Sequence, residues 1–188
     1  MAKQFPAFND ELSSFVAEQK VFFVATAPTE GSVNLSPKGM DSLRILSPDR
    51  IIWLNVTGSG NETAAHVLEN GRMTIMWCAF TGAPLILRAY GTARAVHPTD
   101  NDWGRLAAQL PVIPGARQIF DLSVDMVQTS CGMAVPCLDF NTERTLLRDW
   151  ANKKGPEEIA EYWKKKNLRS IDGLNTGMDQ VTERRTDV

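Results

Sequence analysis

Apolar residues gather in short runs along the first two thirds of the chain, and turn residues separate these runs. The runs lie at residues 21–27, 50–56, 72–80, 85–96 and 117–130. Each is bounded by Pro, Gly, Asp, Asn or Ser, a pattern typical of β-strands joined by turns. Apolar and polar residues alternate along 117–130, which predicts a half-buried strand. The 72–80 run hardly alternates, so we expect that strand to be buried on both faces.

Helical spacing is found in four segments of the chain. Asn9 precedes two acidic residues and an apolar stripe, so a short helix is expected to begin there. Further helices are expected at residues 61–69, 99–110 and 141–167. The last segment is amphipathic but contains Gly155-Pro156, which predicts two short helices rather than one.

The order of these elements predicts the fold class. Strands follow one another as hairpins, with a single short helix between two of them, and no βαβ repeat of the Rossmann type is found. We therefore expect a mainly β protein with flanking helices, built as an antiparallel barrel that is closed or partly split. Residues 1–140 are expected to form this barrel together with the N-terminal helix. Residues 141–188 are expected to form a helical tail that packs on the barrel or on a dimer partner.

Composition and charge narrow the function classes. The 188 residues include 20 basic and 22 acidic side chains, a net charge of −2, so no overall field favours nucleic acid or a membrane surface. No segment reaches the roughly 20 apolar residues of a membrane-spanning helix, and the N-terminal residues do not resemble a signal peptide. Cys78, Cys131 and Cys137 are odd in number and are expected to be reduced thiols. These observations predict a soluble, cytoplasmic protein.

The loop between the 50–56 run and the next helix is the first candidate site. It reads TGSG at residues 57–60 and continues as Asn-Glu-Thr at 61–63. Its glycines allow close approach of the backbone, and the N-terminus of a helix offers unpaired N–H groups to an anion. The same residues would equally suit a tight turn with an Asn or Thr cap. The loop alone does not decide between a phosphate site and a turn.

Several polar residues lie within apolar strands and need partners. Arg88 stands between two apolar residues, so we expect it to pair with a phosphate or with Asp121 or Asp125. Isolated histidines without cysteine pairs predict no metal site. By the two-residue period of a strand, Gln128 and Ser130 share one face.

The series of elements, with the motifs VNLSPKG, WLNVTGSGNETAAHVLENG and VQTSCG, resembles the pyridoxamine 5′-phosphate oxidase-like family of flavin-binding split barrels over roughly residues 10–137. The resemblance implies a split antiparallel β-barrel of the FMN-binding type. It also implies a homodimer with FMN at the subunit interface and a small-molecule substrate. The 57–63 segment would then be the loop that holds the FMN phosphate.

The resemblance assigns cofactor contacts to particular positions. Lys38 matches the lysine of the strand that lines the flavin, and the end of the following strand supplies a second segment. Together with the polar strand positions above, the residues expected to contact FMN are Asn34, Ser36, Lys38, Leu54, Asn55, Ser59, Gly60, Asn61, Thr63, Arg88, Gln128 and Ser130.

Departures from the family pattern bear on both charge and substrate. Val33 replaces an arginine, and residues 60–61 are Gly-Asn where the oxidase has Arg-Lys. A further cation is therefore expected, with Arg72, Arg88 and Arg169 as candidates. The arginine-rich C-terminal segment of the vitamin B6 oxidase is not recognisable, which argues against that substrate. We expect an FMN-dependent oxidoreductase of another small molecule, with no catalytic residue identified. The alternatives are a non-catalytic binder of flavin, haem or deazaflavin, and a dimeric scaffold without a ligand.

Overall fold

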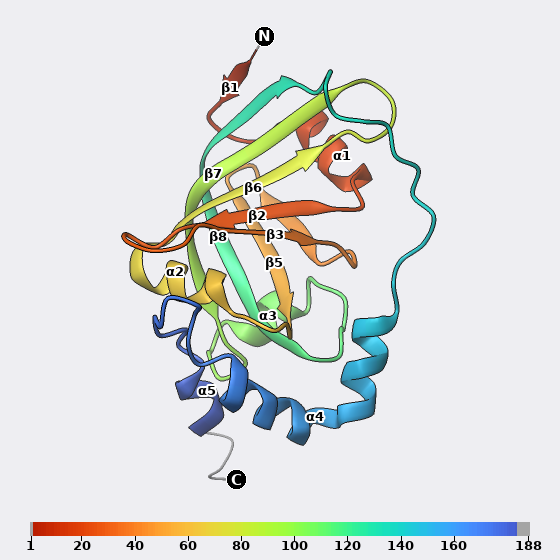
Figure 1. Ribbon diagram of the computed structural model, residues 1–188. Coiled ribbons are helices and arrows are strands. Elements are labelled where there is room, and N and C mark those ends of the chain that lie inside the picture. Colours follow the sequence, from red (N-terminus) through yellow and green to blue (C-terminus); the bar gives the residue numbers. More distant parts are fainter. Residues whose placement is uncertain (1, 184–188) are drawn as a thin grey trace.

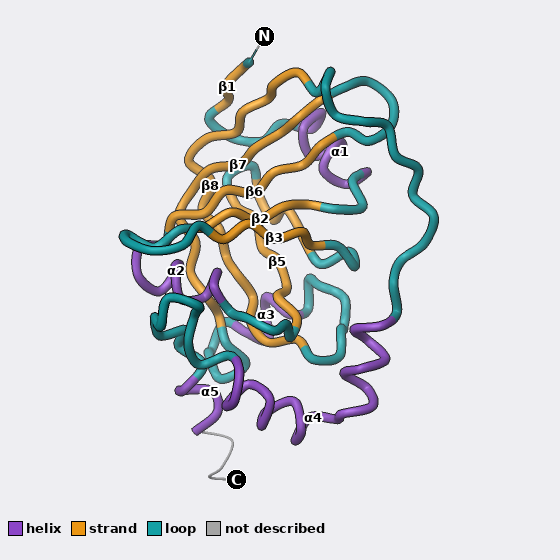
Figure 2. The backbone as a smooth tube through the Cα atoms, in the orientation of Figure 1, coloured by secondary structure: helices purple, strands orange, loops and turns teal. Residues whose placement is uncertain are grey.

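The computed structural model describes residues 2–183, which form one curled antiparallel sheet with helices around it (Figures 1 and 2). The strands are β1 (Lys3–Phe5), β2 (Phe22–Thr26), β3 (Asn34–Lys38), β4 (Leu43–Ser47), β5 (Arg50–Val56), β6 (Arg72–Cys78), β7 (Leu85–Val96) and β8 (Ala116–Cys131). The helices are α1 (Asp10–Glu18), α2 (Glu62–Asn70), α3 (Trp103–Ala107), α4 (Leu146–Lys166) and α5 (Asp179–Glu183).

The strand order defines a split barrel. Within the described residues the order is β3-β2-β6-β7-β8-β5-β4, and β1 pairs with β8 outside this path. All the pairings are antiparallel, and β3 and β4 form the edges, so the sheet curls around its core without closing. The expected mainly β fold with flanking helices is confirmed. Helix α1 lies near one end of the barrel, and α2, α3 and the C-terminal helices gather toward the other end (Figure 1).

The inner face of the sheet holds an aromatic core. Trp53 and Phe120 lie opposite each other on β5 and β8 and stack with their ring centroids 4.6 Å apart. Burying these large rings supplies much of the hydrophobic stabilisation of such a core. The strands β7 and β8 come unusually close at Gly91, where a Cβ atom would lie 1.9 Å from the carbonyl oxygen of Ser123. Only glycine fits this position, and the pairing of the two strands shifts register there.

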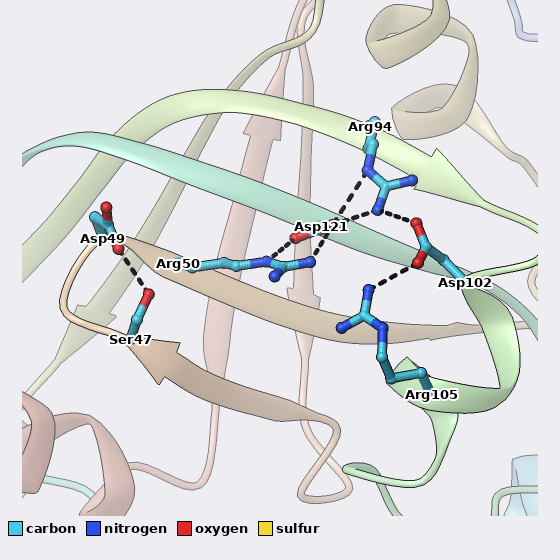
Figure 3. A network of polar contacts seen from close by, with 7 residues as sticks. All are labelled: Ser47, Asp49, Arg50, Arg94, Asp102, Arg105 and Asp121. Carbon is cyan, nitrogen blue, oxygen red and sulfur yellow. Dashed lines mark hydrogen bonds and ion pairs between the residues drawn. The ribbon is translucent and has the colours of Figure 1, made fainter.

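A chain of ion pairs ties the outer side of the sheet together (Figure 3). The carboxylate of Asp121 on β8 is 8% exposed and accepts hydrogen bonds from Arg50 on β5 and Arg94 on β7. Arg94 also contacts Asp102, which pairs with Arg105 of α3. One buried carboxylate therefore joins three neighbouring strands, and its partners extend the network to α3.

The structure corrects several expectations from the sequence. Strand β6 is not buried on both faces, because Met73 and Ile75 are buried whereas Thr74 and Met76 are only half-buried. The helix expected at 99–110 is limited to Trp103–Ala107 (α3). The break at Gly155 is confirmed, since this residue adopts φ 71° and ψ 171° inside α4.

Candidate cofactor site

The 57–63 loop connects the end of β5 to the start of α2, and its backbone N–H groups are unusually free. The N–H of Thr57 donates to the carbonyl of Gly115 at 2.8 Å. Among the residues that the structure describes, no acceptor is found for the N–H groups of residues 58–63. Consecutive free N–H groups before a helix N-terminus form an anion-binding concavity.

The carbonyl groups of the same loop are already engaged. Asn167 Nδ2 donates to the Gly58 carbonyl oxygen at 3.1 Å, and Arg117 Nη1 donates to the Gly60 carbonyl oxygen at 3.1 Å. Two carbonyl groups of the loop therefore have side-chain partners, whereas the N–H groups of residues 58–63 have no acceptor among the described residues. This asymmetry suits a ligand that accepts hydrogen bonds, such as a phosphate.

Arg117, near the start of β8, is the most unusual charge of the site. It is 2% exposed, and none of the ion pairs within residues 2–183 includes it. Its Nε atom has no partner in the described part of the chain. Burial lowers the pKa of the guanidinium to about 10, and the neighbouring Tyr162 and Glu62 oppose that effect. The group remains protonated at neutral pH, so it is a buried cation without a bound counter-charge.

Lys38 supplies a second cation at the end of β3. Its Nζ atom lies 5.7 Å from the centroid of the Trp53 ring, and the ion pairs of the described residues do not include it. Burial and then the positive charge of Arg117 lower the pKa of Lys38 to about 8. Two cations that repel each other in a partly buried place are both stabilised when an anion binds near them, so this region favours an anionic ligand.

Two cavities lie next to these groups. One, of about 610 Å³, is bounded by Lys38, by Phe80 and by apolar residues of the 138–147 segment, which runs along the outside of the barrel (Figure 2). The other, of about 390 Å³, lies between Gly58, Ser59 and the side chains of α4. Both cavities are lined by Leu146 and Leu147, so they adjoin. Their size is in the range of pockets that hold small molecules.

Several predicted residues meet beside the loop. Asn34 Nδ2 donates to Thr63 Oγ1 at 3.2 Å, which joins β3 to the first turn of α2. Asn55 Nδ2 donates to Gln118 Oε1 at 3.1 Å inside the barrel. Asn61 is 2% exposed, and neither Nδ2 nor Oδ1 of its amide has a partner within the described residues. An unsatisfied buried amide next to free N–H groups indicates a place for a polar ligand.

A second group of predicted residues lies on β7 and β8. Arg88 Nη1 donates to Ser130 Oγ at 3.1 Å, and Gln128 Oε1 accepts from the Tyr90 hydroxyl at 3.2 Å. Within the described residues, no hydrogen bond or ion pair joins this group to the 57–63 loop. The expected pairing of Arg88 with Asp121 is wrong, because Asp121 binds two other arginines.

The remaining predicted residues have different surroundings. Ser36 lies opposite Val24 on the β3 edge strand and is half-buried. The side chain of Leu54 packs in the apolar cluster beside α3, away from the polar groups of the loop. Ser59 is exposed at the loop itself.

Sequence reasoning missed Arg117 and chose other arginines for the further cation. Arg72 is exposed at the start of β6, and Arg169 donates to the Gly173 carbonyl at 3.5 Å in the tail. Arg117 reaches the loop because Val56 and Ala116 pair across β5 and β8. That pairing joins distant parts of the chain, so no local motif around Arg117 could have indicated it.

The described residues contain neither a metal cluster nor a membrane-spanning helix. Within residues 2–183, no cluster of three or more His, Cys, Asp or Glu side chains could hold a metal ion. No helix in this part of the chain is long and apolar enough to cross a membrane.

Two comparisons with known proteins point to the same family. The family model described as pyridoxamine 5′-phosphate oxidase matches residues 8–131. A pyridoxamine 5′-phosphate oxidase family protein of Aspergillus flavus, ustO, is 35% identical over 90% of this chain and 76% of its own length.

Two solved structures share the fold at lower sequence identity. HupZ of Group A Streptococcus is 18% identical, with a TM-score of 0.52 over 65% of this chain and 98% of its own. A Lactobacillus delbrueckii protein provisionally assigned as a pyridoxamine 5′-phosphate oxidase is 20% identical, with a TM-score of 0.52 over 65% and 94% of the two chains.

Proposed function

The chain belongs to the pyridoxamine 5′-phosphate oxidase family, and on that premise we propose that it binds FMN, with the phosphate on the 57–63 loop. One observation carries the proposal. The loop has free N–H groups at residues 58–63, and next to it lies Arg117, a buried cation without an ion-pair partner in the described chain. A tight turn before a helix would also leave N–H groups free, but it would not need a buried arginine without an ion-pair partner.

The charges fit a phosphate monoester. Such a group carries about −1.5 to −2 at neutral pH, with three strong acceptor oxygens. Arg117 and Lys38 supply two positive charges, and the N-terminus of α2 adds a partial positive charge. The unsatisfied Asn61 amide and the Thr63 hydroxyl are further polar groups of the site. These residues take the place of the Arg-Lys pair that the loop lacks.

The cofactor would supply the redox chemistry, because a flavin accepts and donates a hydride or single electrons. The chain's own residues bind and orient it. The cavity of about 610 Å³ beside Lys38 offers space for a small-molecule substrate with apolar surface. An oxidoreductase is therefore the activity that we propose, with a substrate other than vitamin B6.

We also assign the Arg88, Gln128 and Ser130 group to a subunit interface. These residues are half-buried on the side of β7 and β8 that faces away from the core. Leu87 and Ala89, on either side of Arg88, are buried and so face the core. In a homodimer, this face would approach the FMN bound to the other subunit and complete its surroundings. A symmetric dimer would thus contain two equivalent sites.

The test is the visible absorption spectrum of the protein purified without added cofactor, before and after release by heat. We expect the flavin bands, and FMN in the released fraction at one per subunit. Colourless protein that does not bind added FMN would contradict the proposal and leave the loop as a turn. A Soret band would instead support a haem-binding protein.

A further inference from the structure

The segment at residues 163–172 lies against the 57–63 loop, and three of its N–H groups donate hydrogen bonds to acceptor atoms of that loop. We infer that this C-terminal segment is part of the cofactor site, and that Asn167 is a positioning residue that sets the loop for phosphate. The inference rests on the proposed FMN function and adds a determinant of phosphate recognition to it.

Asn167 is held rigidly where it meets the loop. Its side chain is fully buried, and Nδ2 donates to the Gly58 carbonyl oxygen at 3.1 Å. Its backbone N–H donates to the Trp163 carbonyl, and its carbonyl accepts from Thr176 Oγ1 at 2.6 Å. These bonds fix the backbone of Asn167, and burial together with the bond to Gly58 holds its amide, whose Oδ1 has no partner among the described residues. A peptide group whose carbonyl is fixed in this way also has a fixed direction for the following N–H.

Trp163 fixes the first residue of the loop. Its indole Nε1 donates to Thr57 Oγ1 at 2.8 Å, and Thr57 Oγ1 in turn donates to the Gly115 carbonyl oxygen at 2.7 Å. Both Trp163 and Thr57 are buried. This chain of bonds links α4, the loop and the residues before β8.

The far end of the segment binds one oxygen of the Glu62 carboxylate. The backbone N–H of Ile171 donates to Glu62 Oε2 at 2.8 Å. Asp172 accepts from both the N–H and the hydroxyl of Ser32, between β2 and β3, at 2.8 and 3.0 Å. Glu62 Oε2 is thereby bound to the tail, while Oε1 stays beside Gly60.

These contacts predict coupling between phosphate and tail. Because the segment binds the Gly58 carbonyl and one oxygen of Glu62, it favours the observed arrangement of the loop, in which the N–H groups of residues 58–63 have no acceptor in the described chain. A phosphate that binds those donors must then stabilise the docked tail by the same free energy. Riboflavin, which has the same ring system without the phosphate, would not share this coupling.

The first test compares ligand affinities of two matched variants. Asn167→Ala removes the donor to Gly58, and Asn152→Ala removes an exposed asparagine of α4 in the same tail. We expect Asn167→Ala to weaken FMN about tenfold, because the Gly58 carbonyl loses its partner and the loop its fixed direction, and to change riboflavin affinity by less than about twofold. Asn152→Ala should change neither affinity. Equal losses for FMN and riboflavin, or no loss for FMN, would overturn the inference.

A second test uses the unaltered protein and does not depend on the folding of a variant. Trypsin cleavage after Lys164, Lys165, Lys166 and Arg169 reports undocking of the tail. FMN and inorganic phosphate should slow this cleavage, whereas riboflavin, or chloride at equal ionic strength, should not. Equal protection by riboflavin, or no protection by phosphate, would contradict the coupling. Protection by phosphate in a protein that does not bind FMN would support the coupling while rejecting FMN as the ligand.

Discussion

Arg117 Nη1 donates to the carbonyl oxygen of Gly60 at 3.1 Å, and this contact joins the start of β8 to the loop before α2. The guanidinium is buried, yet among the described ion pairs it has none. Most buried charges are paired, because the loss of hydration costs several kcal/mol per ion. A buried cation that is bonded to a loop carbonyl is therefore better explained by binding than by stability.

Replacing Arg117 with Met should distinguish a role in ligand binding from a role in protein stability. We expect FMN affinity to fall about 10- to 100-fold, since charge-assisted hydrogen bonds to the phosphate are lost. The melting temperature of the ligand-free protein should stay the same or rise, because an unpaired buried charge is removed. Isothermal titration and a thermal melt measure the two effects, with Arg105→Met, an exposed arginine of α3, as the control. A lower melting temperature with unchanged FMN affinity would show that Arg117 is structural.

Lys38 should make FMN binding dependent on pH. Its pKa in the folded protein is about 8, below the ordinary 10.5, because of burial and the charge of Arg117. Below pH 8 the ammonium is present and binds phosphate, so affinity should fall as pH rises through 8. Fluorescence titrations between pH 7 and 9.5 measure this, and riboflavin should show no such change. Lys38→Arg should flatten the profile, because a guanidinium does not lose its proton in this range. A profile that is the same in both proteins would exclude Lys38 as the titrating group.

The lowered pKa of Lys38 also affects the stability of the ligand-free protein. Between pH 8 and 10.5 the unfolded chain keeps a proton on Lys38 that the folded chain has lost. The contribution of this group to the free energy of unfolding therefore increases with pH in that window. Urea unfolding at pH 7.5 and 10 measures it. The increase should be smaller in Lys38→Met, which has no proton to lose.

Asn61 provides a test with little effect on folding. Neither atom of its amide has a partner in the described residues, and it makes no side-chain cap to α2. Asn61→Ala should therefore leave the melting temperature nearly unchanged and weaken FMN about fivefold through the loss of one hydrogen bond. Asn101→Ala, in an exposed turn, serves as the control. Unchanged FMN affinity at Asn61→Ala would mean that the phosphate lies elsewhere.

Asp121 should matter for stability and not for the cofactor. Burial raises the pKa of its carboxyl, but hydrogen bonds and charges of Arg50 and Arg94 outweigh that effect and lower it overall. Asp121→Asn should reduce the free energy of unfolding at pH 7 by roughly 1–2 kcal/mol, because two partly exposed arginines lose their counter-charge. A depressed folded-state pKa gives stability that is present above the unfolded value of 3.8 and lost as pH falls through the folded value. The difference between the two proteins in urea unfolding should therefore shrink below pH 4, while FMN affinity stays the same.

The parts of the fold that were predicted well have strong local patterns. The runs at 50–56 and 85–96 coincide with β5 and β7, because turn residues bound both of them. Asn9 caps α1 as its side chain suggests, accepting from the Leu12 N–H at 2.8 Å. Strand β4 was not predicted from the sequence. All five of its residues are half-buried, so the strand has no buried face to mark by alternating apolar and polar residues.

The candidate site was only partly predictable for a related reason. Lys38, Asn61 and Thr63 stand in local motifs. Asn61 and Thr63 belong to the loop, and Lys38 lies close enough to Arg117 for the two charges to repel. Arg117 and Asn167 reach the loop through tertiary structure, across separations of 57 and 109 residues. No spacing rule connects residues that meet only because β5 pairs with β8 or because α4 ends beside the loop.

The separation of Asn167 from Gly58 also sets an order of events during protein synthesis. The two residues are 109 positions apart, which corresponds to roughly 5–20 s of translation. Strands β6, β7 and β8 are made in this interval, but Trp163 and Asn167, which bond the loop, are not yet available. A nascent chain should therefore hold FMN weakly until α4 has left the ribosome, so cofactor loading would be among the last steps of maturation.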